Sequence, residues 1–182
     1  MVSAVSTFLA VLAFLSCTFI AITLLTFVAK KWLRLPCFGR LHKAASPFWL
    51  EFVMIVALVS TLGSLFYSEV AHFTPCVLCW YQRILMYPQP LLAYLALVRK
   101  ERTFIKPYLV AMSLVGFAVA LYHNAIQWLP TLFPLAPCDA SGVSCAKIYP
   151  VAFGWVTIPM MSATAFALLL TILLVYGRPS KK

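Results

Sequence analysis

Charge is scarce in this chain of 182 residues: 10% of them are charged, whereas 64% are hydrophobic. A soluble domain of this size cannot bury so many apolar side chains, because its core volume is limited by its surface. The apolar residues fall instead in five runs, each near the ~20 residues that a helix needs to cross a bilayer. The runs cover about residues 3–29, 48–70, 78–98, 107–129 and 158–176. They predict an all-α polytopic membrane protein.

The stretch before Lys30 contains no basic residue. Cleavable signal peptides need a basic N-terminal region and have an apolar core of only about 7–15 residues. The first apolar run is uncharged and much longer. We therefore expect it to be retained as an additional transmembrane helix with its N-terminus outside. Internal repeats and low-complexity tracts are also lacking.

Acidic residues number only four, which leaves a formal net charge of +10. Twelve of the 14 basic residues lie between the first and second runs, between the third and fourth, or after the fifth. Connections rich in Lys and Arg stay in the cytoplasm. We therefore predict a cytoplasmic C-terminus and place the other two connections, which contain Arg83 and Lys147, on the outer face. The charge is a topology signal, and no nucleic-acid partner is predicted.

The six cysteines separate by position. Cys17 falls within the first apolar run and Cys37 in a basic connection, and reduced thiols are expected at both places. The remaining four lie in the predicted outer connections: Cys76, Cys79, Cys138 and Cys145. An oxidising environment lets disulfides persist there. Four cysteines allow three pairings, and the sequence leaves all three open.

Two features around Cys76 and Cys79 predict redox activity. Pro75 precedes the pair and an apolar helix follows, so Cys76 is expected near the helix N-terminus, where unpaired N–H groups and the helix dipole lower a thiol pKa. Arg83 falls four residues after Cys79, one turn deeper on the same face. A charge this far into an apolar run faces the bundle interior or a site, or it snorkels to the interface. We favour a guanidinium that polarises an electron-accepting carbonyl, with a snorkelling anchor as the alternative.

Histidines are few, and only His72 lies in an outer connection. Zinc is the alternative use of two cysteine pairs, but six residues separate Cys138 from Cys145, so no metal site is predicted. Disulfides that only staple the outer loops are a further alternative. His123 lies in the outer third of the fourth run, and its expected level beside Arg83 predicts a shared ligand pocket. A hydrogen bond across helices is the simpler interpretation of His123.

Prolines mark three features of the chain: a kink, an irregular loop and a helix start. Pro88 and Pro90 each remove a backbone hydrogen bond, which predicts a kink in the third helix. The outer connection at residues 130–157 contains four prolines and two glycines and predicts an irregular loop. Thr157-Ile-Pro159 is typical of a helix start, with proline in the first turn, and predicts where the last helix begins.

Five segments follow one another along the chain: Cys76-Val-Leu-Cys-Trp-Tyr-Gln-Arg83, Tyr122-His-Asn-Ala-Ile-Gln127, Pro137-Cys138, Gly142-Val-Ser-Cys145 and Thr157-Ile-Pro159. Together they resemble the DsbB/BdbC family of membrane disulfide-bond formation proteins, and the match covers about residues 48–176. Members of this family reoxidise a secreted thioredoxin-fold thiol oxidase and pass the electrons to quinone. The resemblance implies a four-helix bundle, to which the first apolar run adds a helix.

The resemblance also implies a role for each outer cysteine. Cys76 and Cys79 are expected to exchange electrons with a quinone, either menaquinone or ubiquinone. In this scheme Cys79 is the thiolate that contacts the quinone, and Cys76 is the resolving cysteine. Cys138 is expected to form a mixed disulfide with the partner, an extracytoplasmic DsbA/BdbD-like oxidase, and Cys145 to link back to the first pair.

By the same resemblance, Arg83 and His123 hold the quinone. We therefore predict a disulfide-forming thiol:quinone oxidoreductase in the bacterial cytoplasmic membrane. Residues 1–47 are predicted as an extra helix with a basic loop, 48–177 as the redox domain and 178–182 as a basic tail. The extra helix and the short spacing of the second cysteine pair depart from the family pattern. The alternatives are a structural or assembly protein with stapled outer loops, and a reductase of the vitamin K epoxide reductase type.

Overall fold

The computed structural model describes residues 2–33, 45–129 and 143–177. The α-helices are α1 Val2–Leu33, α3 Trp49–Leu65, α4 Val77–Met86, α5 Pro88–Val98, α6 Arg102–Trp128 and α7 Ile158–Thr171. Three shorter elements are the 3-10 turn η1 Ser46–Phe48 and the π-helical continuations η2 Phe66–Val70 and η3 Ile172–Tyr176. The two strands are β1 Pro150–Ala152 and β2 Val156–Thr157.

Four helical segments are long and apolar enough to cross a membrane: Val2–Phe27, Ser46–Val70, Arg102–Trp128 and Ile158–Tyr176. Each of them turns large apolar side chains outward, among them Leu25, Leu62, Leu114 and Leu174. Helices satisfy their own backbone hydrogen bonds, so such a surface is compatible with lipid. The predicted class, an all-α polytopic membrane protein, is confirmed, and one short hairpin is added to it.

The third apolar run differs from the single span predicted over residues 78–98. It forms two helices, α4 and α5, which are interrupted at Tyr87, and neither alone is long enough to span a bilayer. The cause is the predicted one, because Pro88 and Pro90 cannot donate the backbone hydrogen bonds that would continue α4. The prolines therefore break the third helix where the sequence predicted a kink.

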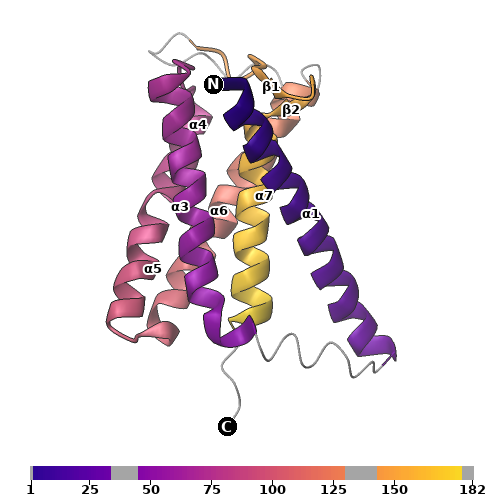
Figure 1. Cartoon of the computed structure of the whole chain (residues 1–182), viewed down its shortest axis with the longest axis vertical. Coiled ribbons are helices and arrows are strands. Elements are labelled where there is room, and N and C mark those ends of the chain that lie inside the picture. The colour runs from indigo at the N-terminus through magenta and orange to yellow at the C-terminus, as the bar shows by residue number, and fades with distance from the viewer. Residues whose placement is uncertain (1, 34–44, 130–142, 178–182) are drawn as a thin grey trace.

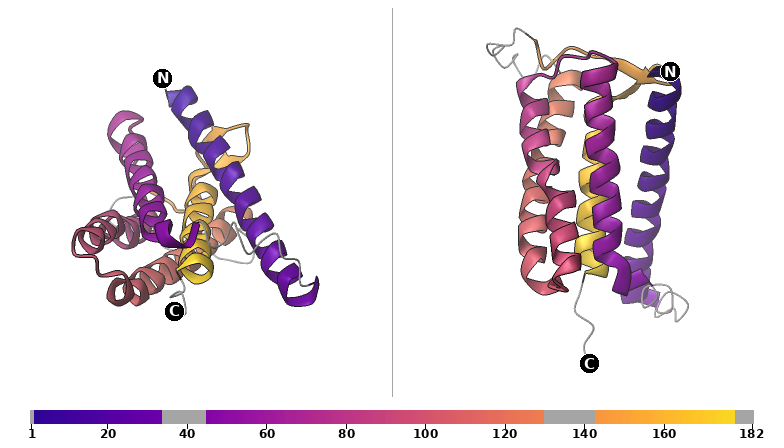
Figure 2. Two further views of the ribbon diagram at one scale, coloured as in Figure 1. Left: turned by 60° about the horizontal axis from the view of Figure 1, so that its bottom comes forward. Right: turned by 60° about the vertical axis from the view of Figure 1, so that its left-hand side comes forward.

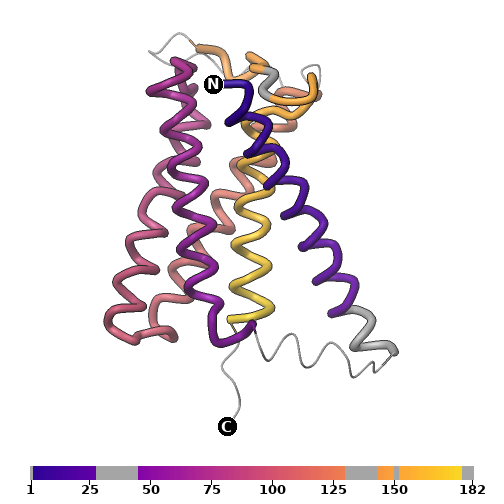
Figure 3. Tube along the Cα trace, viewed as in Figure 1, coloured from indigo at the N-terminus to yellow at the C-terminus, as the bar shows by residue number. Residues whose placement is uncertain are grey.

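The helices form a bundle with one helix outside it. Within the bundle, α6 packs along α7 and α3 along α5 (Figure 1). The additional helix α1 packs against α7 and diverges from it along its length, and the left-hand view of Figure 2 shows α7 between α3 and α1. The starts of α1 and α4 and the β-hairpin lie at the same end of the molecule (Figure 3). That end holds the site.

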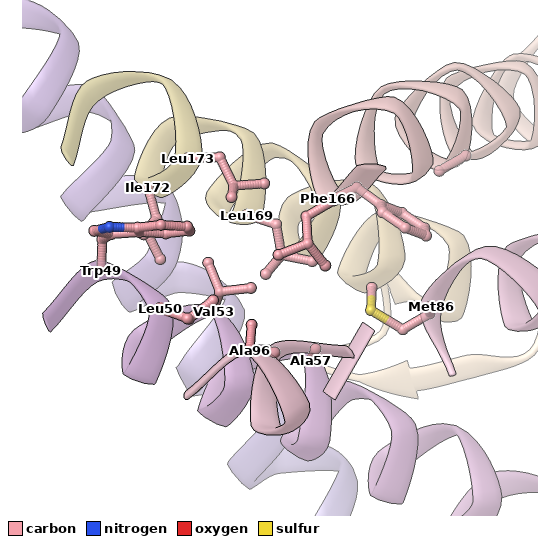
Figure 4. Close-up of a cluster of buried hydrophobic side chains, with 13 residues drawn as sticks. Trp49, Leu50, Val53, Ala57, Met86, Ala96, Phe166, Leu169, Ile172 and Leu173 are labelled. Carbon is pink, nitrogen blue, oxygen red and sulfur yellow. The ribbon is translucent and has the colours of Figure 1, made fainter. Parts of the chain in front are cut away.

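The bundle core is built from buried side chains of α3, α5, α6 and α7 (Figure 4). Leu50 and Leu169 lie within it, and Phe166 is fully buried between α6 and α7. A Cβ atom added at Gly116 would lie only 2.3 Å from the Phe166 ring. The glycine therefore lets α6 and α7 approach closely, as small residues do at membrane helix interfaces.

The end of the second outer connection is more regular than predicted. Strands β1 and β2 pair antiparallel, with Pro150 opposite Thr157. The turn between them uses two consecutive left-handed residues, Phe153 at φ 53° and Gly154 at φ 76°. Composition alone predicted an irregular loop because proline and glycine are read as loop formers, yet here Pro150 begins β1 and Gly154 lies in the turn of the hairpin. The last helix begins at Ile158 with Pro159 in its first turn, as predicted.

Candidate functional site

Cys76 is the N-terminal cap residue of α4, and its extended backbone conformation follows Pro75. Its thiol donates a hydrogen bond to the sulfur of Cys79, one helical turn away, with the two Sγ atoms 3.4 Å apart. A disulfide requires about 2.05 Å, so the pair is a dithiol here. Cys76 is buried and Cys79 half-buried. The pair is therefore in reach of disulfide formation with only a small movement of the two sulfurs.

The charge on this pair differs from what the sequence predicted. We expected a lowered pKa for Cys76 at the helix N-terminus, but its hydrogen bond to Cys79, together with burial, raises the pKa of the Cys76 thiol to about 12. Both effects favour the protonated thiol, in the direction opposite to the lower pKa expected at a helix N-terminus. Cys79, as the acceptor of the S–H hydrogen bond, is consequently the sulfur on which a thiolate is stabilised.

Arg83 is turned into the bundle and does not snorkel. Its Nε donates to Ser64 Oγ and its Nη2 to the Ser64 carbonyl, both at 3.0 Å, which ties α4 to α3. The Tyr87 hydroxyl donates to the same Oγ at 3.1 Å, and the Trp80 ring centre lies 5.2 Å from the guanidinium carbon. Among the described residues, Nη1 has no acceptor. One donor group of the guanidinium thus remains for a ligand.

His123 of α6 contacts residues of both connections that carry the site cysteines, at Cys76 and Cys145. Its Nε2 lies 3.1 Å from the Cys145 carbonyl oxygen and 3.7 Å from Cys76 Sγ, while its Nδ1 lies 3.2 Å from the amide nitrogen of Gln82. A carbonyl only accepts, so Nε2 carries the hydrogen. The Gln82 amide then donates to Nδ1, which fixes one tautomer of a ring that is only 2% exposed.

Five of the six predicted site residues line one cavity: Cys76, Cys79, Arg83, His123 and Cys145. The cavity holds about 570 Å³ of empty space, part of it open to the surroundings. Cys79 and Arg83 also line a second cavity that continues between α1, α3 and α7. The sixth predicted residue, Cys138, lies outside the described residues.

An aromatic stack covers the site. The ring of Phe73 stacks on Tyr67 on one side, with 6.0 Å between centres, and on Tyr149 on the other, with 4.8 Å. The Lys147 ammonium lies 4.8 Å from the Tyr149 ring centre, and Gln127 donates from α6 to the Lys147 carbonyl. These contacts hold the segment after residue 142 against the connection that carries Cys76.

Sequence reasoning missed three residues that position the site. Gln82 is buried against His123, and Ser64 and Tyr87 hold Arg83. The sequence offered a signal for Gln82, because it is a polar residue between the cysteine pair and Arg83 in a mostly apolar segment. It also offered one for Tyr87, which follows Arg83 by four residues, about one helical turn. Ser64 offered none, because a lone serine in a membrane helix most often bonds its own backbone.

Cys76, Cys79 and His123 place three potential metal-ligand atoms within 4.8 Å of one another. A ligand nitrogen must be free of hydrogen, whereas Nε2 donates to the Cys145 carbonyl. A metal there requires His123 to give up that hydrogen bond. The expectation that the site holds no metal stays a prediction.

Comparison with known proteins gives consistent matches. The sequence model of a family described as "Disulfide bond formation protein DsbB" matches residues 45–176. The chain is 42% identical over 130 residues to the SPbeta prophage-derived disulfide bond formation protein B of Bacillus subtilis, covering 71% of this chain and 86% of that protein. It is 41% identical over 116 residues to disulfide bond formation protein C of the same organism, covering 64% and 83%.

More distant relatives carry similar names. A probable disulfide formation protein of Coxiella burnetii is 35% identical over 116 residues, which cover 64% of this chain and 78% of that protein. No solved structure matches the chain. The matched range begins just before α3 and ends with η3, so that α1 lies outside it.

Proposed function

The chain belongs to the DsbB family of disulfide bond formation proteins, and from this premise we propose that it is a thiol:quinone oxidoreductase. It is an integral membrane protein with a DsbB-like role in disulfide formation. The proposal adds the electron path: from an extracytoplasmic thioredoxin-fold thiol oxidase, through the two cysteine pairs, to a membrane quinone.

One observation carries this proposal: a hydrogen-bonded dithiol and a half-buried arginine with a spare donor line the same largely apolar cavity. A quinone has a flat apolar ring with carbonyl oxygens that accept hydrogen bonds. Arg83 offers Nη1 to such an oxygen, and Tyr67, Ile158 and Pro159 supply apolar lining. The residues therefore fit this ligand, whose ring would be held at Cys79 and Arg83.

A bound quinone supplies an acceptor for two electrons and two protons. Cys79, the acceptor in the S–H hydrogen bond, contributes the thiolate, and Cys76 keeps its proton until the S–S bond forms. Joining the two sulfurs releases two electrons and, counted from the two thiols, two protons, which balance the formation of a quinol. Arg83 would stabilise negative charge on a ring oxygen without reorganisation, because Ser64 already holds the guanidinium in place.

The second pair restores the dithiol. Reduced Cys138 and Cys145 attack the Cys76–Cys79 disulfide by thiol–disulfide exchange, so one disulfide is lost and one is formed. Cys145 is well placed for this because it lines the same cavity and its carbonyl accepts from His123. The partner oxidase would then reduce the new disulfide at Cys138, a role that rests on the family resemblance.

We further propose that both cysteine pairs lie on the outer face of a bacterial cytoplasmic membrane and that the C-terminus is cytoplasmic. The distribution of basic residues supports this orientation. It agrees with an arrangement in which the start of α4 and the hairpin share one end of the bundle while α7 ends at the other (Figure 1).

The proposal is tested with purified protein, a reduced thioredoxin-fold oxidase and quinone, with quinol formation as the readout. Cys79→Ser is expected to abolish turnover, because no thiolate then faces the quinone. Cys17→Ser is the matched control and should keep the wild-type rate, since Cys17 lines neither cavity at the dithiol and its contact with Thr164 Oγ1 is one that serine can also make. Full turnover by Cys79→Ser, or no quinol from the wild type, would overturn the assignment.

A further inference from the structure

Helix α1 lies outside the family match, yet it forms one wall of a groove. The floor of the groove is α7 and the opposite wall is α3, with lining side chains that include Leu12, Ala13, Ile55, Thr164 and Leu168. It holds about 640 Å³ of empty space, part of it open to the surroundings. Figure 2 shows α7 lying between the two walls.

This groove continues the redox site. The second cavity, which Cys79 and Arg83 line, shares with the groove the side chains of Leu9, Val59, Ser60, Met161 and Ala165. Leu9 lies at the junction, and a Cβ atom added at Gly63 would be 3.1 Å from its Cδ1. A ligand with its polar head at Arg83 can therefore extend from the second cavity along α1 into the groove between α1, α3 and α7.

The groove presents mainly apolar surface. Each of its hydroxyl groups donates within its own helix: Ser16 to the Leu12 carbonyl at 2.7 Å, and Ser60 to that of Val56 at 2.8 Å. Thr164 likewise donates within α7, at 3.0 Å, and its Oγ1 also lies 3.7 Å from the Cys17 sulfur of α1. Since these donors are satisfied, the groove suits a hydrocarbon chain better than a polar ligand.

We propose that this groove takes the isoprenoid tail of the quinone whose ring would lie at Cys79 and Arg83, and that α1 forms the wall that keeps the space for the tail open. The inference rests on the proposed function. The groove adds little affinity of its own, because lipid is as apolar as the groove. Its effect is steric, because the ring can occupy the site while the tail extends away from it through the groove without a clash.

Substitution of groove residues tests the proposal through the choice between quinones. Ala13→Phe fills the groove, whereas Ala21→Phe adds the same ring at an exposed position of α1. For Ala13→Phe, the ratio of kcat/KM for a long-tailed quinone to that for a tailless analogue should fall about tenfold or more, about 1.4 kcal/mol. For Ala21→Phe the ratio should stay at the wild-type value. Ser60→Phe fills the groove from α3 and serves if Ala13→Phe does not fold.

Photolabelling gives a readout independent of turnover. A quinone with a diazirine at the end of its tail should label α1 and α3 peptides that line the groove, and excess tailed quinone, but not excess phospholipid, should suppress the label. An unchanged ratio in folded groove variants, or labelling that phospholipid suppresses equally, would overturn the groove as a tail site. Failure of the proposed function would give a different result: the wild-type protein would reduce neither the long-tailed quinone nor the tailless analogue.

Discussion

Gln82 is the residue that decides which nitrogen of His123 carries hydrogen. Its amide donates to Nδ1, while Nε2 donates to the Cys145 carbonyl. Replacing the amide by a carboxylate removes the donor and supplies an acceptor, so Gln82→Glu should place hydrogen on Nδ1 as well and convert the ring to imidazolium. Nitrogen-15 NMR of histidine-labelled protein checks this, with His123→Asn to identify the signal. A wild-type ring with hydrogen on Nδ1 would contradict the assignment.

The two thiols of the first pair are expected to differ in reactivity. Because the pKa of Cys76 is raised to about 12, its thiolate is scarce below pH 9 and grows only as the pH approaches 12. Alkylating agents react with the thiolate. The first equivalent of iodoacetamide at pH 8 should therefore modify Cys79, as measured by peptide mass spectrometry of reduced protein. Replacing Cys17, Cys37, Cys138 and Cys145 by serine leaves only the first pair of the six cysteines, and first modification at Cys76 would count against the hydrogen-bond direction.

The close packing of α6 against α7 depends on one glycine. Gly116 faces the fully buried ring of Phe166, and any Cβ atom there falls inside the ring's van der Waals surface. Gly116→Ala should lower stability by about 1–3 kcal/mol, the usual cost of overpacking. Thermal unfolding in detergent measures the loss. Val115→Leu, at an exposed position of the same helix, is the control and should unfold at the wild-type temperature. An unchanged unfolding midpoint for Gly116→Ala would contradict the prediction, because it would show that α6 and α7 separate at little cost.

At the same scale, sequence patterns predicted some elements and missed others. Apolar runs located every long helix, and Pro88 and Pro90 marked where the third helix breaks, because hydrophobic length and proline chemistry act locally. The hairpin and the contact of Ser64 with Arg83 depend on neighbours distant in sequence. The pKa of Cys76 was predicted with the wrong sign, because the helix-end argument included neither the hydrogen bond to Cys79 nor the burial of the thiol, the two largest causes that raise it.

For the whole molecule, the bundle brings the connection before α4, the connection before α7 and the half-buried Arg83 to the same end (Figure 1). His123 bonds to the Cys145 backbone, and the stack through Phe73 joins Tyr67 to Tyr149. Neither cysteine pair alone distinguishes a redox enzyme from stapled loops. The cavity that Cys76, Cys79 and Cys145 share with Arg83 is what favours electron transfer, and α1 extends the adjoining cavity into a groove.

The central claim is that the Cys76–Cys79 dithiol itself reduces the quinone. The most direct measurement is a single turnover of Cys138→Ser/Cys145→Ser protein, reduced and mixed with quinone in the absence of oxygen and partner. The account predicts one quinol for each protein molecule, together with a disulfide that joins Cys76 to Cys79 in peptide mass spectra. Unreduced quinone with both thiols still free, in protein that remains folded, would contradict it.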